Sequence, residues 1–247
     1  RSLGDVERFL GNASESRCYL SQAIDLFQAE RNIIGEAGAI LALGRVESRV
    51  GNLGDAGVHF QKALSLYEQR KSQLGRGSTM KCMGDICFKD FRLAEAESFY
   101  IKALALFQEM SDHLGEAQSL RGLGDIQLSK ECFEDARPYL TKALALYECL
   151  GSERGQANSL RGLAIIELRA GNSTTADDLY MRAKILFESI REKLFRNEWK
   201  HLEQVEYELQ SLNPDSGSSF ETWTLEEAAN QRIGSAQTLD ILSEVER

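Results

Sequence analysis

Apolar residues recur at helical spacing through most of the chain, in segments separated by short polar breaks. The segments Leu74 to Phe88 and Ala94 to Met110 each carry apolar residues three and four positions apart, which places them on one face of an α-helix. The alternation of apolar and polar residues that marks strands is missing from the sequence, and prolines number two. The pattern therefore predicts an all-α protein built of amphipathic helices.

The helical pattern repeats every forty residues. The string "SLRGLGDIQL" at 119–128 returns as "SLRGLAIIEL" at 159–168. Small residues form one column of the repeat, and a second column of glycines marks the joins between copies: Gly4, Gly44, Gly84, Gly124 and Ala164, then Gly35, Gly75, Gly115 and Gly155. A single pair of such helices cannot bury its apolar face, so consecutive pairs are expected to stack into a solenoid.

Two motifs in this repeat resemble the tetratricopeptide repeat. They are Leu43-Gly44 with Ala56, Phe60 and Ala63, and Met83-Gly84 with Ala96, Tyr100 and Ala103. The family's tryptophan, tyrosine and terminal proline are missing, and the period of forty exceeds its usual length of about 34 residues. The long repeat is similar to those of kinesin light chain and of the spindle adaptor with Leu-Gly-Asn repeats. The resemblance implies a right-handed α-solenoid of helix-turn-helix repeats, with a concave groove lined by the first helix of each pair.

The period divides the chain into three parts. Residues 1–193 hold four full copies, beginning near Ile34, Leu74, Leu114 and Arg154, after a copy truncated at its start. Residues 194–212 continue with one apolar stripe and predict a C-terminal capping helix. Residues 213–247 read as a linker and a partly helical, acidic tail. Because Arg1 already lies within the repeat pattern, we expect the chain to be a fragment of a longer protein.

Composition narrows the possible partners. The net charge of −9 disfavours nucleic-acid binding, which needs a basic surface. No apolar run reaches the roughly 18 residues of a membrane span, and no signal peptide is visible, so no membrane partner is expected. The five cysteines are odd in number and lack paired spacing, which favours reduced thiols and a cytoplasmic protein.

The sequence offers no motif for catalysis. The three histidines lie at unrelated positions of the repeat, and phosphate-binding and nucleophile motifs are missing. We therefore expect a non-catalytic protein without cofactor or metal, an interaction scaffold or adaptor.

The implied concave face carries a mixture of paired and unpaired charges. Lys81 with Asp85, and Arg121 with Asp125, are opposite charges four residues apart, a spacing that forms helix-surface pairs. The pairing fails in the last copy, where Ile165 replaces the acid opposite Arg161. Arg45 and Arg49 likewise have no acid at that spacing.

Unpaired arginines beside apolar residues predict an acidic, partly hydrophobic peptide as the ligand. In this interpretation Asn158 hydrogen-bonds the peptide backbone. The predicted peptide-binding residues are Arg45, Arg49, Lys81, Asp85, Phe88, Lys89, Arg121, Asp125, Leu128, Asn158, Arg161, Ile165 and Arg169.

Three further hypotheses stay open from the sequence. The acidic tail is a candidate for the same groove in cis. The repeats also fit a ligand-sensing array of a larger signalling ATPase. Self-association through exposed repeat ends is a third reading, because the first copy lacks a recognisable polar cap.

Overall fold

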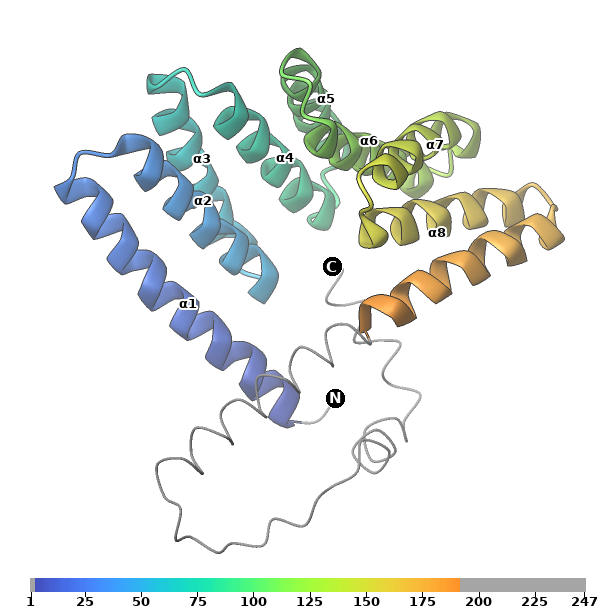
Figure 1. The fold of residues 1–247 in the computed structure, drawn as a ribbon, viewed down its shortest axis with the longest axis horizontal. Coiled ribbons are helices and arrows are strands. Elements are labelled where there is room, and N and C mark those ends of the chain that lie inside the picture. Colours follow the sequence, from blue (N-terminus) through green and yellow to red (C-terminus); the bar gives the residue numbers. More distant parts are fainter. Residues whose placement is uncertain (1–2, 192–247) are drawn as a thin grey trace, which may run out of the picture. The chain divides into compact units, whose positions relative to one another are not determined.

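A computed structural model describes the backbone of residues 3–191 and the side chains of residues 13–191 (Figure 1). The described residues are helical throughout apart from short turns. The helices are α1 (Leu3–Ala29), α2 (Ile33–Val50), α3 (Leu53–Gln69), α4 (Gln73–Lys89), α5 (Leu93–Glu109), α6 (His113–Ser129), α7 (Phe133–Cys149) and α8 (Glu153–Arg169). A further helical segment covers 173–191. Residues 2–188 form one compact unit.

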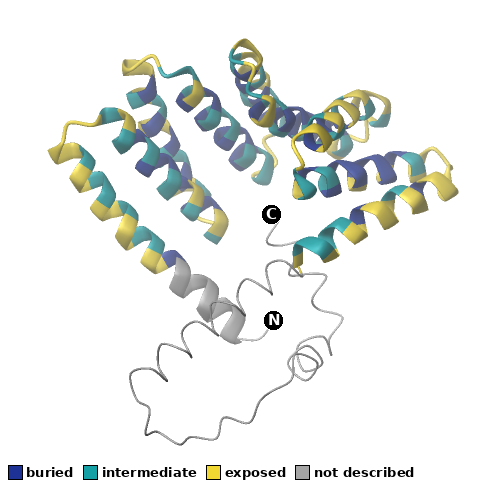
Figure 2. Cartoon of the chain, viewed as in Figure 1, coloured by how far each residue is buried: buried dark blue, intermediate teal, exposed yellow. Residues whose placement is uncertain are grey.

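The helices pair as the forty-residue period predicts. Each pair α2–α3, α4–α5 and α6–α7 packs together and then against the first helix of the next pair. The expected helices 74–88 and 94–110 are confirmed as α4 and α5. Small residues let the helices approach, and the alanines of the repeat columns are fully buried between them (Figure 2). They are Ala56, Ala63, Ala96, Ala103, Ala136 and Ala143.

The glycines at the joins are explained by the aromatic rings that lie against them. A Cβ atom added to Gly75 would stand 2.2 Å from the ring of Tyr67, and one added to Gly155 would stand 2.2 Å from the ring of Tyr147. Real Cβ atoms do not approach a ring so closely. The ring at the end of one copy therefore requires glycine at the start of the next.

The first copy differs from the expected truncated pair. It contributes a single helix, α1, of 27 residues, which runs through Gly11 and Asn12. The same Gly-Asn dipeptide ends α2 at Gly51 and Asn52. α3 packs against both α2 and α4, whereas the main described contact of α1 is with α2.

Several expectations lie outside the described residues. They include the capping helix 194–212, the linker and tail 213–247, and the boundary at 193. These stay predictions. Crossing a bilayer would take a longer or more apolar helix than any that the described residues form. Within the same residues, no three His, Cys, Asp or Glu side chains gather as metal ligands.

Candidate functional site

The predicted binding residues lie on the first helices of the pairs, α2, α4, α6 and α8. Each of these helices contacts the next: α2 with α4, α4 with α6, and α6 with α8. We call their shared surface the first-helix face. Residues four and seven or eight positions apart fall on one side of a helix. For this reason Lys81, Asp85 and Lys89 of α4 lie in line, as do Arg121, Asp125 and Leu128 of α6.

A carboxylate with two partners lies at the centre of the face. Asp85 accepts a hydrogen bond from Lys81 Nζ at 2.9 Å, which confirms the predicted pair, and a second from the Tyr100 hydroxyl at 2.7 Å. Asp85 raises the pKa of Lys81, more than burial lowers it. Burial first, and then Asp85, raises the pKa of Tyr100 well above its usual value. Lys81 is therefore a fixed, fully charged cation.

The next helix repeats the charge pair without the tyrosine. Arg121 Nη1 donates to Asp125 Oδ2 at 2.6 Å, which confirms the second predicted pair. Burial raises the pKa of Asp125, opposed by the charges of Arg121 and Arg161. Arg161 therefore acts on Asp125 from α8, although no acid of the described residues lies within ion-pair distance of it. The sequence correctly indicated a missing partner on its own helix, but not this influence across helices.

Arg45 of α2 and Lys89 of α4 are held by groups that carry no negative charge. Arg45 Nε donates to the Cys82 sulfur at 3.3 Å. Lys89 Nζ donates to the Ser48 carbonyl at 3.0 Å and to its hydroxyl at 3.2 Å. Burial lowers the pKa of Lys89, Asp85 opposes this change, and the positive charges of Lys81 and Arg49 add to it. Both cations are positioned without an acid of the described residues at ion-pair distance, although the charge of Asp85 acts on each of them.

The apolar residues of the prediction differ in how far they are exposed. Phe88 and Leu128 are half-buried and pack against the core beside Tyr100 and Leu140, so they belong partly to the interior. Ile165 and Leu168 of α8 are open instead, 41 % and 62 % exposed. The free apolar surface of the face therefore lies on its last described helix.

Asn158 is also engaged within its own helix. Its Nδ2 atom donates to the Arg154 carbonyl at 3.1 Å. The predicted contact with a peptide backbone would have to use its side-chain oxygen or break this bond.

Taken together, the predicted residues give the face a positive charge on an acidic chain. Arg49, Arg161 and Arg169 are exposed, and no described acid pairs with them. The set holds seven basic and two acidic side chains: Arg45, Arg49, Lys81, Lys89, Arg121, Arg161 and Arg169, against Asp85 and Asp125.

Sequence reasoning missed two residues that shape this face. Tyr100 comes from α5, and Cys82 comes from the buried side of α4. Tyr100 belongs to the repeat column that holds Phe60 and Leu140, and all three side chains are buried. Its hydroxyl was the available signal, because a buried tyrosine usually finds a hydrogen-bond partner.

Comparisons with known proteins agree with this architecture. Residues 75–148 match the family model described as tetratricopeptide repeat. Comparison of the sequence with curated proteins gave no match.

Solved structures share the fold at low sequence identity. BtubC (BKLC) from P. vanneervenii has a TM-score of 0.60 at 19 % identity, and the match covers 74 % of each chain. The apo form of RapI has a TM-score of 0.55 at 14 % identity, over 76 % of this chain and 81 % of its own. A single-substitution variant of a putative kinesin light chain of Podosopora anserina has a TM-score of 0.50 at 15 % identity. The match covers 75 % of this chain and 97 % of that one.

These structures share the stacked helix pairs, and the last carries what its name calls nearly identical TPR-like repeats. The forty-residue columns extend beyond the matched segment in both directions, with the same alanines buried. Residues 75–148 thus belong to the tetratricopeptide repeat family, and the helices on either side continue its all-α solenoid.

Proposed function

We propose that the chain is a non-catalytic adaptor whose first-helix face binds an acidic, partly hydrophobic segment of another protein. Tetratricopeptide repeats generally mediate interactions between proteins. The observation that carries the proposal is the set of cations held on the face by neutral groups. Arg45 is fixed by a thiol and Lys89 by a serine, so both remain available to an incoming carboxylate.

The face divides into two regions with different chemistry. The region around α2 and α4 favours acidic side chains of the segment, because it carries Arg45, Arg49 and Lys89. On α8, Ile165 and Leu168 lie beside Arg161 and Arg169, which favours an apolar side chain next to an acidic one. Arginine binds a carboxylate through two parallel hydrogen bonds, which adds specificity to the charge attraction.

The two acids of the face have a positioning role in this proposal. Asp85 and Asp125 hold Lys81 and Arg121 at fixed places through short hydrogen bonds. Cations that are already ordered lose less side-chain entropy on binding, so the segment gains affinity from this preorganisation.

The chain's own tail matches the proposed ligand in composition. Residues 215–247 contain seven acidic and two basic side chains, a net charge of −5. We propose it as an occupant in cis, displaced when a partner binds.

The test measures binding of a fluorescein-labelled peptide of residues 215–247 to the full chain by fluorescence anisotropy. A second peptide replaces its acids by Gln and Asn. Two variants with equal charge change are compared: Arg49→Glu with Arg161→Glu on the face, and Arg70→Glu with Lys71→Glu in the α3–α4 turn. We expect the face variant to weaken binding at least about tenfold and the turn variant to change it little.

Equal losses in the two variants, or equal binding of the neutral peptide, would contradict the proposal. Occupation in cis has its own readout. Replacing the seven tail acids in the full chain should strengthen binding of the added acidic peptide; unchanged affinity would argue against the tail as occupant.

A further inference from the structure

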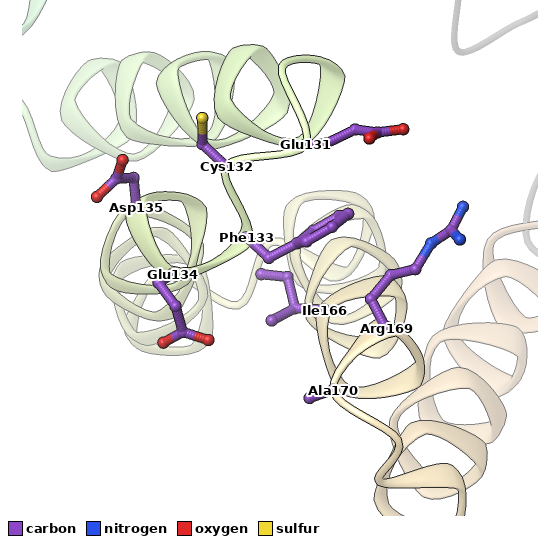
Figure 3. A pocket seen from close by; sticks show the side chains of 8 residues that line it. All are labelled: Glu131, Cys132, Phe133, Glu134, Asp135, Ile166, Arg169 and Ala170. Carbon is purple, nitrogen blue, oxygen red and sulfur yellow. The ribbon is translucent and has the colours of Figure 1, made fainter.

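The predicted binding cations that have no described acid at ion-pair distance fall into two clusters. The α2–α4 cluster consists of Arg45, Arg49 and Lys89, and the positive charge of Arg49 acts on Lys89. The α8 cluster consists of Arg161 and Arg169, both exposed. Figure 3 shows the Arg169 side chain extending from the end of α8, close to the ring of Phe133.

Helix α6 lies between the two clusters and is neutral on this side. Its cation Arg121 is bonded to Asp125 at 2.6 Å. Ser129 takes the repeat position that holds a cation on α2, α4 and α8. The neighbouring Leu128 is apolar and half-buried. The positive charge of the first-helix face is therefore divided into two parts.

One repeat position explains why α6 is neutral and α8 is not. Asp125 and Ile165 both stand four residues after an arginine. On α6 the carboxylate of Asp125 already binds Arg121. On α8 the matching Arg161 has only Ile165 at that place, and this side chain is 41 % exposed. A carboxylate that arrives from a ligand therefore finds Arg161 open and Arg121 already engaged.

We infer that the ligand carries two acidic groups separated by an uncharged stretch, one group for each cluster. This inference rests on the proposed function, because it describes the segment that the first-helix face binds. The uncharged stretch crosses α6 beside Leu128, where an acid would meet the carboxylate of Asp125 instead of an open cation. The second acidic group binds Arg161, beside the exposed side chain of Ile165.

The distance between the two acidic groups follows from the packing of the helices. The first helices contact one another in order, α2 with α4, α4 with α6 and α6 with α8. Packed helices lie about 8–10 Å apart, so two steps from α4 or three from α2 place the clusters about 16–30 Å apart. An extended chain covers about 3.3 Å per residue, so about five to nine residues separate the acidic groups.

The acids of the chain's own tail follow this pattern in sequence. One group consists of Asp215, Glu221, Glu226 and Glu227, and the other of Asp240, Glu244 and Glu246. Residues 228–239 between them hold no acid. Fully extended, this stretch covers about 40 Å, which is long enough for the proposed separation.

Peptides of fixed length test the separation. Two Glu-Glu pairs are joined by a stiff spacer of about two, eight or twenty prolines, which holds them about 6, 25 or 60 Å apart. A fourth peptide keeps the middle spacer and replaces one Glu-Glu pair by Gln-Gln. Fluorescence anisotropy measures the binding of each labelled peptide to the full chain. We expect the middle peptide with two pairs to bind at least about tenfold more tightly than the other three, because both clusters hold it at once.

Two substitutions at an exposed position test the role of Arg161. Ile165→Asp gives α8 the acid that α6 already has. It should reduce the affinity of the middle two-pair peptide to that of the one-pair peptide. Ile165→Asn is the matched control, nearly equal in size but without charge, and should lower the affinity little.

The outcomes separate this inference from the proposed function. Equal binding of the three two-pair peptides, equal binding of the one-pair peptide, or equal losses in the two Ile165 variants would overturn the divided ligand. If Arg49→Glu with Arg161→Glu still weakens peptide binding in those cases, the proposed function stands without it. If none of the peptides binds, or if that double variant binds them as well as the wild type, the proposed function fails and the inference fails with it.

Discussion

Arg17 of α1 and Glu47 of α2, thirty residues apart, share two hydrogen bonds of 2.6 and 2.9 Å. Asn52 donates a third to the same carboxylate at 2.8 Å. The pair ties the last helix of one copy to the first helix of the next. The same thirty-residue spacing joins Arg137 to Glu167. It also joins Glu97 to Gln127, where the acid lies on the earlier helix and the donor on the later one.

The Arg17–Glu47 pair predicts an acid-sensitive contribution to stability. Its hydrogen bonds, from Arg17 and then Asn52, lower the pKa of Glu47 from 4.5 to about 2. A carboxylate with a lowered folded-state pKa stabilises the fold above its unfolded pKa and loses that effect as pH falls from about 4.5 to 2. Glu47→Gln should therefore lose on the order of 2–3 kcal/mol near neutral pH and little at pH 2, measured by urea unfolding across pH.

Glu109 is exposed and provides the control substitution. Glu109→Gln should change the free energy of unfolding little near neutral pH. If Glu47→Gln kept the wild-type slope between pH 4.5 and 2, the carboxylate would not be the group that titrates.

The packing of rings on glycines predicts opposite effects for two alanine substitutions. A Cβ at Gly75 meets the Tyr67 ring, so Gly75→Ala should destabilise the chain by about 1–3 kcal/mol through overpacking. A Cβ at Gly54 meets nothing within 4 Å, so Gly54→Ala should stabilise α3 by a few tenths to about 1 kcal/mol. Thermal unfolding of both variants measures the difference; equal effects would contradict it.

Two buried serines at matching repeat positions should respond differently to substitution by alanine, because one of their hydroxyls has no hydrogen-bond partner. Ser119 donates to the Gly115 carbonyl at 2.9 Å, whereas the buried Ser159 hydroxyl at the matching position makes no hydrogen bond in the described structure. Ser119→Ala should cost about 1 kcal/mol, and Ser159→Ala should be neutral or stabilising. Urea unfolding of the two variants checks this, and a comparable loss for Ser159→Ala would show that its hydroxyl is satisfied after all.

The Tyr100 hydroxyl predicts a modest effect at the centre of the first-helix face. Tyr100→Phe removes one of the two hydrogen bonds to Asp85 and should cost about 1 kcal/mol in unfolding free energy. Tyr180→Phe, at a side chain 53 % exposed, is the control and should change stability little. A loss no greater than that of the control would mean that Lys81 alone satisfies Asp85.

Sequence periodicity was enough to predict the helices but only part of the face. The repeat columns report spacing within one helix. That spacing is enough to predict the helix bounds and the pairs Lys81–Asp85 and Arg121–Asp125. The contact of Arg45 with Cys82 joins residues of different copies, and its length depends on how two helices pack. The same packing buries Phe88 and Leu128 against the neighbouring pair, which no spacing within α4 or α6 reveals.

The thirty-residue pairs also fix the order in which copies can follow one another. Rings on glycines would fit at any junction between full copies, since each full copy begins with a glycine and ends in an aromatic ring. The polar pairs differ between junctions. A chain shortened by the forty residues 114–153 would still seat Phe107 on Gly155, but it would place Glu97 opposite Glu167, two carboxylates with no cation between them. The copies are thus alike in shape yet not interchangeable, and a duplication or loss of one copy carries an electrostatic cost that depends on where it falls.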